Sequence, residues 1–503
     1  MFSSGGFVCV IKQILSFRLL LHVLFCLALW VEDGMAAQKV EAEPFSLSTL
    51  DVLQGIKDFT LDNGLRVIVL PDKRSPVVTH AVAYAVGNAD VPSGKSGLAH
   101  YVEHLMFKGT GEDPGISFSE KMNSVGGSYN AFTSQDYTVY YERVLKPHLG
   151  FVMELEADRM ANLTIDSKDA KTELKVVLEE RLQRVDSNPR AQLYEAMNYV
   201  IFGVSPYRFS VLGTQNDLEN LDASDARAFY EEWYSPENAT VLVFGDVSYV
   251  EVKRLAEKIY GKIAKRAGKS SDKRTRSKES PSFASERLVG VDTKDLSASS
   301  IVMSWLVPSL LSGEAGEAES ITLLCNLIGG DRNSSRLYKR LVLEKKLATH
   351  TACQYSSTTI GDTVLSIVAV PTEKVSSEVL FEEIKLAISE LRTDGISEKE
   401  LYKAKHHVIG SFAHLQDSLV YRANLVGTAV AIGRSITDIT TWPSKLHSVD
   451  LGSVTRVLNQ YLIPERLVMG YLFEPGSSVS IEKNAGSLDN SNYASALGGT
   501  LDD

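Results

Sequence analysis

The segment GLAHYVEHLMFKGT, residues 97–110, places two histidines and a glutamate within five positions of a mainly apolar stretch. Residues four apart on a helix lie on the same face, so His100 and His104 can present two imidazoles to one metal ion. Glu103 falls beside them, where a carboxylate can act as general base on metal-bound water without ligating the metal. Two histidine nitrogens and a carboxylate oxygen suit Zn²⁺ and leave a fourth position for water.

The alternative is that the two histidines lie by chance on a partly buried helix and form local hydrogen bonds. With ten histidines in 503 residues, a random His-X-X-Glu-His is expected in roughly one such sequence in a hundred. The motif therefore favours a metal site.

A third ligand is expected from a carboxylate on another helix. The segment DAKTELKVVLEERLQRVD supplies Glu173, Glu179 and Glu180 among apolar residues. Seven residues bring a helix back to within about 20° of the same direction, so Glu173, Val177 and Glu180 share one stripe. Glu179 points elsewhere. Helical geometry alone leaves open the alternative that all three carboxylates face solvent.

Short β-rich runs and turns surround these helices. Asn63-Gly64, in DFTLDNGLRVIVLPD, predicts a tight hairpin turn because both residues tolerate positive φ. VVTHAVAYAV is a further strand candidate, and GNADVPSGKSG is a loop ahead of the histidine helix. A Gly-Gly pair then precedes an aromatic, threonine-rich pair of strands, and residues 147–184 have a helical pattern.

A second copy of this plan follows along the chain. NLTIDSKDAKTELKVVLEER and RTDGISEKELYKAKHHVIGSF both run from a turn into a helix, 231 residues apart at Ile165 and Ile396. EEWYSPENATVLVFGDV and NQYLIPERLVMGYLFEP share Tyr, Pro-Glu and a closing strand, 228 residues apart at Pro236 and Pro464. Nearly equal offsets indicate a duplication, although matches this short also arise by coincidence.

Composition fits a globular protein of two or more domains, with 44% hydrophobic and 23% charged residues. The net charge of −11 argues against a nucleic-acid binder, because phosphate contacts need clustered Lys and Arg. Residues 264–284 are polar and basic and are predicted to form an exposed linker. Residues 476–503 are small and polar and are predicted to be disordered.

The N-terminus predicts export. Two basic residues precede a mainly apolar run at 19–31, and small residues that suit cleavage after Ala36 or Ala37 follow, so residues 1–36 are predicted to be a signal peptide. The run is shorter than the ~20 residues that span a bilayer. An uncleaved anchor is the alternative, and an amphipathic mitochondrial presequence ranks third.

Two cysteines lie outside this segment, Cys325 and Cys353. Export would allow them to form a disulfide. Two separate buried thiols are an equally good reading, because sequence does not give their distance.

The motif HYVEH, a glutamate 76 residues beyond its second histidine, TLDNGLRVIVL and GGSYNAFTSQDYTVYY together resemble the pitrilysin/insulinase zinc metallopeptidases. Length and layout are similar to bacterial members related to the mitochondrial processing peptidase. The resemblance covers about residues 52–475. It implies an α+β fold of two homologous halves, residues 52–263 with the zinc site and 285–475, each a mostly antiparallel sheet flanked by helices, facing each other around a chamber.

The resemblance also implies the roles of the motif residues. His100, His104 and Glu180 would ligate one Zn²⁺ per chain. Glu103 would be the general base, and Glu173 a carboxylate that orients the site without ligating. Zinc would lower the pKa of its bound water, and Glu103 would accept the proton and later return one to the leaving amine.

In this family, the segment matching Asn130, Ala131 and Phe132 is a sheet edge that binds substrate in extended form, in agreement with β-strand addition as a recognition mode. An ordinary hairpin strand is the alternative. The predicted function is hydrolysis of unfolded or short peptides. The predicted location is the periplasm of a Gram-negative bacterium, with a signal anchor in the inner membrane as the alternative.

The sequence departs from the family pattern in its second half. Many members carry an Arg and a Tyr seven residues apart there, as extra donors to the oxyanion. The matching positions hold Val342 and Thr349, and Val has no donor. We expect a related partner subunit to supply the Arg and Tyr, with a homodimer as the alternative assembly. Tyr338 or Arg340 would substitute if the register were shifted.

Two non-enzymatic alternatives remain open, a scaffold subunit that retains the fold and a peptide-binding module that keeps zinc for structure. Lost metal ligands would mark a scaffold, and none is lost here. Structural zinc sites normally take all four ligands from protein, whereas this set leaves one position open. The ligand set therefore favours an enzyme.

Overall fold

The computed structural model describes residues 53–110, 118–265, 274–276, 285–294, 300–330, 335–373 and 375–473. The predicted signal peptide and the predicted disordered tail lie outside these ranges, as does most of the predicted linker. No helix within the described ranges is long and apolar enough to cross a bilayer.

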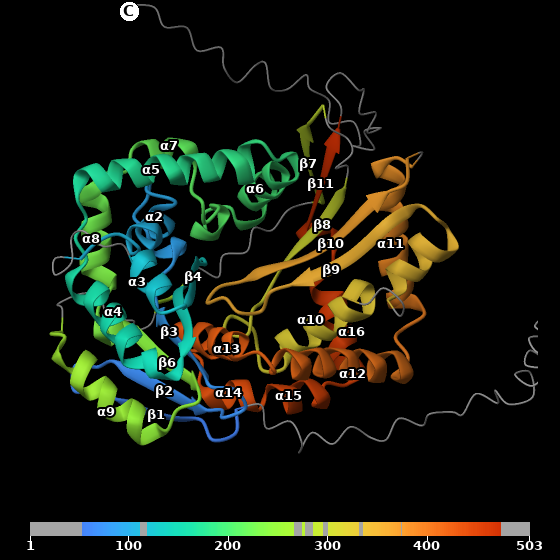
Figure 1. Cartoon of the computed structure of the whole chain (residues 1–503). Helices are drawn as coiled ribbons and strands as arrows, with labels where there is room; N and C mark the ends of the chain where they lie inside the picture. Colours follow the sequence, from blue (N-terminus) through green and yellow to red (C-terminus); the bar gives the residue numbers. More distant parts are fainter. Residues whose placement is uncertain are drawn as a thin grey trace, which may run out of the picture. The chain divides into compact units, whose positions relative to one another are not determined.

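The strands form two sheets (Figure 1). The first has the order β1-β2-β6-β3-β5-β4 and the second the order β7-β11-β8-β10-β9. The first sheet comprises β1 (Lys57–Thr60), β2 (Arg66–Pro71), β3 (Val77–Tyr84), β4 (Ser128–Thr133), β5 (Thr138–Leu145) and β6 (Ala239–Gly245). The second comprises β7 (Arg287–Asp292), β8 (Ile301–Val307), β9 (Ala348–Tyr355), β10 (Thr363–Pro371) and β11 (Leu467–Phe473).

The two sheets repeat one topology. From β2 onward the first sheet matches the second strand for strand, and in both the first strand of the match pairs in parallel with the closing strand. The other matched neighbours are antiparallel in both sheets. The predicted duplication and the predicted α+β fold of two homologous halves are confirmed.

Helices cover both sheets. Those of the first half are α2 (Leu98–Leu105), α3 (Phe118–Ser124), α4 (Leu149–Asn162), α5 (Ser167–Arg181), α6 (Pro189–Phe202), α7 (Gln215–Glu219), α8 (Ala223–Trp233) and α9 (Tyr249–Ile259). Those of the second are α10 (Glu317–Cys325), α11 (Ser377–Thr393), α12 (Glu398–Leu415), α13 (Leu419–Ala431), α14 (Ile436–Thr440), α15 (Trp442–Ser448) and α16 (Leu451–Tyr461). A short π-helix, η4 (Leu182–Asp186), continues α5.

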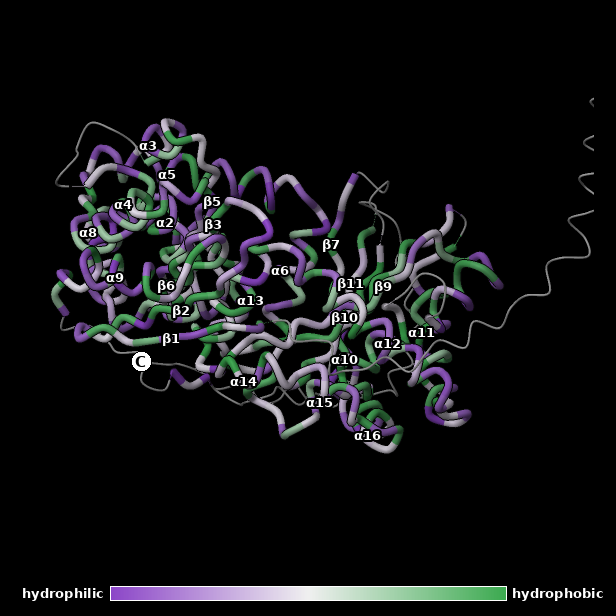
Figure 2. Tube along the Cα trace, turned by 60° about the horizontal axis from the view of Figure 1, so that its bottom comes forward, coloured by the Kyte–Doolittle hydropathy of each residue, from purple (hydrophilic) through white to green (hydrophobic). Residues whose placement is uncertain are grey.

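The halves exchange one helix each. Helix α6 of the first half packs on β7, β8 and β11 of the second sheet, and α13 of the second half packs on β3, β5 and β6 of the first (Figure 1). In Figure 2 hydrophobic stretches occur along the strands of both sheets, and hydrophobic and hydrophilic residues alternate along the helices. The exchange means that each half needs the other to cover its sheet.

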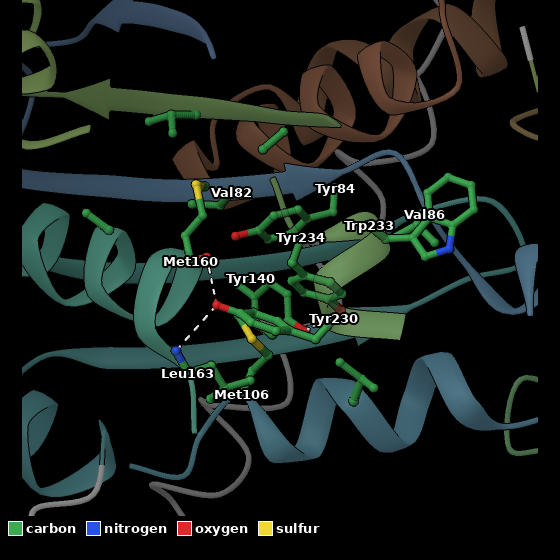
Figure 3. Close-up of a cluster of buried hydrophobic side chains, with 14 of the residues drawn as sticks. Val82, Tyr84, Val86, Met106, Tyr140, Met160, Leu163, Tyr230, Trp233 and Tyr234 are labelled. Carbon is green, nitrogen blue, oxygen red and sulfur yellow. Dashed lines mark hydrogen bonds between the residues drawn. The ribbon is translucent and has the colours of Figure 1, made fainter. Parts of the chain in front are cut away.

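A cluster of tyrosines fills the core between the first sheet and its helices (Figure 3). A buried tyrosine hydroxyl needs a hydrogen-bond partner. Tyr140 and Tyr234 pair their hydroxyls at 3.0 Å. The Tyr230 hydroxyl donates to the Met160 carbonyl at 2.7 Å and accepts from the Leu163 amide at 3.3 Å. Tyr230 thus fixes the end of α4, just ahead of the helix that carries Glu173 and Glu180.

The predicted hairpin at Asn63-Gly64 forms, but its turn is longer than predicted. Strands β1 and β2 pair from Thr60 and Arg66 outward, so the loop comprises residues 61–65. Gly64 has φ 89°, whereas Asn63 does not have positive φ. The Asn63 amide instead donates to the carbonyls of Tyr260 and Ile263, at 2.8 and 3.0 Å, which ties the hairpin to the end of α9.

Two arginines of the predicted linker are not exposed. The side chains of Arg274 and Arg276 are each 8% exposed, and both bind Asp90 at 2.8 Å. Arg276 also binds Asp136 at 2.7 Å. The expectation of a solvated linker is therefore wrong at Arg274 and Arg276, because buried carboxylates hold these two side chains.

Cys325 and Cys353 are disulfide-bonded, with Cα atoms 5.4 Å apart. The bond joins the end of α10 to β9 and decides between the two readings that the sequence left open. A disulfide is typical of proteins in oxidising compartments.

Candidate metal centre

Helix α2 carries the motif and begins at a position that only glycine can occupy. Gly97, its N-cap, has φ 87°, and a Cβ there would lie 2.8 Å from Leu218 Cδ2. Its amide donates to Asn88 Oδ1 at 2.9 Å, and the Ser96 amide donates to Asp217 at 3.0 Å. These contacts fix where the helix starts and hence the direction of its histidines.

Three side chains from two helices converge. His100 Nε2 lies 3.2 Å from His104 Nε2, and Glu180 Oε2 lies 3.3 Å from His104 Nε2 and 3.6 Å from His100 Nε2. Within the described residues, this is the one group of three side chains able to hold a metal ion. Glu179 is exposed and its carboxylate accepts from Gln183, so it stays out of the group.

The three atoms fit a zinc site. Tetrahedral ligands at zinc bond lengths of about 2.0–2.1 Å lie about 3.3 Å from one another, close to the three distances between these atoms. Two imidazole nitrogens that face a carboxylate oxygen offer three lone pairs to a cation when both nitrogens are unprotonated. This donor set suits Zn²⁺.

Glu173 contacts the side of the His104 ring that faces away from the ligand group. Its Oε1 accepts from His104 Nδ1 at 2.9 Å, and its Oε2 accepts from Lys108 Nζ at 2.5 Å. A proton held on Nδ1 leaves Nε2 as the lone-pair nitrogen, directed at the ligand group. The Tyr101 hydroxyl donates to the Ala170 carbonyl at 2.6 Å and joins α2 to α5 next to this contact.

Glu103 lies beside the ligand group and is not one of its members. The residue is 8% exposed, and its Oε2 accepts a 2.5 Å hydrogen bond from the Thr133 hydroxyl at the end of β4. A carboxylate held in this way keeps its second oxygen available for a proton.

Burial governs protonation at the site. Burial, with the charges of His104 and Arg184, lowers the pKa of His100 to about 3. Burial raises the pKa of Glu103, partly opposed by its bond from Thr133. Burial would lower the pKa of His104, but the hydrogen bond to Glu173 and nearby carboxylates raise it.

The predicted substrate residues lie on an edge strand. Asn130, Ala131 and Phe132 belong to β4, which ends the first sheet and pairs with β5. An edge strand offers backbone N–H and C=O groups to an extended peptide. Thr133 of the same strand contacts Glu103, so this edge runs directly to the site.

The residues at the two expected donor positions do not provide an Arg and a Tyr. Thr349 lies on β9, where its hydroxyl donates to the Val370 carbonyl at 3.4 Å, and Val342 lies in a π-helical segment. Arg340 would replace the missing Arg if the register were shifted, but its guanidinium binds Glu383 and Glu390 of α11.

Comparison with known families identifies the fold. The family described as Insulinase (Peptidase family M16) matches residues 66–215, and the one described as Peptidase M16 inactive domain matches residues 220–408. The chain belongs to the pitrilysin/insulinase family of zinc peptidases. The first match contains the whole ligand group, and the family assignment predicted from the motif is confirmed.

Curated relatives and solved structures agree. The zinc protease PqqE of Helicobacter pylori is 28% identical over 403 residues, covering 80% of this chain and 89% of the relative. The uncharacterized zinc protease YmxG of Bacillus subtilis is 27% identical, covering 71% and 83%. A crystal structure of a protease from Helicobacter pylori superposes with a TM-score of 0.76 at 27% identity, covering 83% of this chain and 99% of that one.

The second half of this family member repeats the metal helix without its ligands. Helix α10 begins, like α2, after a glycine with positive φ, Gly316 at 80°. Counted from the two glycines, the places of His100, Glu103 and His104 are held by Glu319, Thr322 and Leu323.

The second ligand helix has changed in the same way. Helices α5 and α12 begin after Asp166 and Ser397, which both cap with their side chains. Counted from these caps, Ala404 and Ser411 stand where α5 has Glu173 and Glu180. The absent ligands agree with the description of the second match as an inactive domain.

Sequence reasoning missed three side chains at the site. Lys108 and Arg184 each lie four residues after a motif residue and contact a carboxylate of the site, Glu173 and Glu180 respectively. That spacing was a usable signal. Thr133 directly follows Phe132, but its contact with Glu103 depends on how β4 approaches α2 and has no local sequence signal.

Proposed function

We propose that this protein is an exported zinc-dependent endopeptidase that hydrolyses unfolded or short peptides. The observation that carries the proposal is the convergence of His100, His104 and Glu180, with Glu103 next to them and outside the ligand group. Zinc, when bound there, would supply an acidified water and polarise a peptide carbonyl.

The other residues of the site then have separate tasks. Glu103 takes a proton on the carboxylate oxygen that Thr133 leaves free and returns it to the leaving amine. Glu173 keeps the His104 proton on Nδ1. The β4 edge aligns an extended peptide, and its last residue is the one that orients Glu103.

Removal of zinc tests the proposal. The chain stripped with a chelator is expected to lose its cleavage of a mixed peptide library, and one equivalent of Zn²⁺ per chain should restore it, since three side chains converge on a single point. Bound zinc is counted by elemental analysis and cleavage by mass spectrometry. Unchanged cleavage by the zinc-free chain would contradict the proposed role of zinc, and a zinc-loaded chain that cleaves nothing would favour the non-enzymatic scaffold.

We further propose that the missing donors come from a related partner chain, with a homodimer as the alternative assembly. Val342 and Thr349 leave the expected positions without the Arg and Tyr, and Arg340 is bound to α11. In the same assay the isolated chain should bind zinc yet cleave slowly. A cleavage rate per chain that rises with protein concentration would indicate a homodimer. Rescue of cleavage by a related chain that carries the Arg and the Tyr would indicate a partner subunit. Full activity at all dilutions would contradict the proposal.

Thr133→Val is expected to lower turnover about tenfold, because a hydrogen bond to a charged group is typically worth about 1.5–3 kcal/mol. Valine keeps the shape of threonine and removes the hydroxyl that holds Glu103. Thr133→Ser restores the hydroxyl and should stay within about twofold of the parent. Steady-state kcat is the measurement, and equal kcat values for the two variants would rule out this role.

A further inference from the structure

Arg184 is an exposed arginine in contact with one member of the ligand group, Glu180. It lies in η4, one turn after Glu180, and its guanidinium binds Glu180 Oε1 at 2.9 Å. The other oxygen of Glu180, Oε2, faces His100 and His104. A single carboxylate therefore joins Arg184 to the place where a metal would be bound.

Most of this arginine remains accessible. Its side chain is 68% exposed, whereas that of Glu180 is 18% exposed. A guanidinium has five N–H donors in a planar fork that matches a carboxylate. Contact with one oxygen of Glu180 leaves donors of Arg184 open to solvent beside the site.

Two other cations close to the site, Lys108 and Arg181, are held by carboxylates. Lys108 binds Glu173 at 2.5 Å. Arg181 is 7% exposed on its side chain and binds Glu195 and Asp186 at 2.9 and 3.1 Å. Arg184 is the more exposed of the two arginines at the end of α5.

Metal binding changes the charge balance at Arg184. Without a metal, the carboxylate of Glu180 compensates the arginine across their 2.9 Å contact. With Zn²⁺ held by two neutral imidazoles and Glu180, the ligand group carries a charge of about +1, which the neighbouring Glu103 carboxylate offsets, and the positive charge of Arg184 is then left over. A site with this surplus attracts an anionic group of the substrate.

We propose that Arg184 is a specificity residue that binds a carboxylate side chain of the peptide next to the scissile bond. This rests on the proposed peptidase function and extends it to a substrate class, peptides with Asp or Glu close to the cleavage point. The guanidinium fork can hold such a carboxylate in two parallel hydrogen bonds.

Binding to a variant that does not turn over tests the proposal. Peptide pairs that differ by one Glu or Gln, placed in turn at each position around one cleavage point, are bound to the zinc-loaded Glu103→Gln chain. At one position the Glu peptide should bind about three- to tenfold more tightly, in keeping with a partly exposed ion pair. Adding Arg184→Gln should abolish this preference, and Arg184→Glu should invert it in favour of a Lys peptide.

Two controls separate this role from others. Lys175→Gln removes an exposed cation of the same helix and should leave the preference intact. The zinc-free chain should discriminate less than the zinc-loaded one, because Glu180 then compensates Arg184.

Three results would overturn the proposal. They are an unchanged binding preference after Arg184→Gln, loss of zinc by that variant, and, with Arg184→Gln introduced into the parent chain, an equal loss of turnover for Glu and Gln peptides. Loss of zinc would mean that Arg184 acts only by holding Glu180. Equal losses of turnover would mean that it serves the transition state. If the parent chain bound no zinc or cleaved no peptide, the proposed function itself would fail instead.

Discussion

Glu103→Gln is expected to lower peptide turnover by about 10²- to 10⁴-fold, the usual contribution of a general base, while zinc content stays at the parental level. Glutamine has the same shape, and its amide oxygen can still accept the hydrogen bond from Thr133. The glutamine amide is not basic enough to accept a proton from metal-bound water near neutral pH. Because Glu103 lies outside the ligand group, its replacement should leave His100, His104 and Glu180 in place.

The matched control for this variant is Glu179→Gln. Glu179 is exposed, precedes a ligand and bonds to Gln183, so the same chemical change there should leave both turnover and zinc content unchanged. Turnover is measured as kcat and zinc by elemental analysis. Loss of zinc in Glu103→Gln would make Glu103 a ligand, and retention of more than a tenth of kcat would mean that another group accepts the proton.

The sequence predicted the ligand group because helical periodicity is strict. Four residues separate His100 from His104 on one face, and seven separate Glu173 from Glu180 on one stripe. The choice of Glu180 over Glu179 as the third ligand came from the resemblance to the family, and in the structure Glu180 joins the ligand group whereas Glu179 is exposed. The contacts of Glu180 Oε2 with the Nε2 atoms of His100 and His104 depend on how α2 packs on α5. Helical periodicity holds no information on that packing.

The duplication could be predicted from the sequence because it leaves local signals. The exchange of helices between the halves leaves no local signal and could not be predicted. Caps and strand ends recur at nearly constant offsets, as at Ile165 and Ile396, and these are local signals. The helices α6 and α13 are amphipathic in the ordinary way, and an apolar face does not specify whose sheet it will cover. Their exchange between halves is decided by tertiary packing.

The linker shows where composition misleads. A polar, basic stretch is usually exposed to solvent, and residues 264–284 have that composition. Arg274 and Arg276 nevertheless both bind the carboxylate of Asp90, which lies 184 and 186 residues earlier in the chain, respectively. Arg276 binds Asp136 as well. Nothing within the segment indicates such distant partners, since a buried charge is specified by its partner and not by its neighbours in sequence.

Asp136→Ala is expected to lower the free energy of unfolding by about 3–5 kcal/mol, the usual cost of removing one partner from a buried ion pair. Asp136 is fully buried, and one of its oxygens accepts from Arg276 at 2.7 Å. The other oxygen accepts from the Tyr207 hydroxyl and from the Ile360 amide, the latter at 2.9 Å. The loss of this carboxylate would leave the Arg276 guanidinium with Asp90 alone and free the β9–β10 turn. Urea unfolding followed by fluorescence is the measurement.

The exposed pair between Arg74 and Asp417 is a matched control, because it also joins the two halves, at 3.5 Å with side chains 59% and 83% exposed. Asp417→Ala should cost less than about 1 kcal/mol, since solvent screens an exposed pair. In the Asp136→Ala chain alone, amide hydrogen exchange should accelerate at Ile360 and at Gly361, whose amide donates to Tyr207 at 3.0 Å. Equal losses of stability in the two variants, or unchanged exchange at these amides, would show that the buried carboxylate does not hold the halves together. The contrast follows from burial, because the same charge pairing stabilises strongly only where water cannot replace the lost partner.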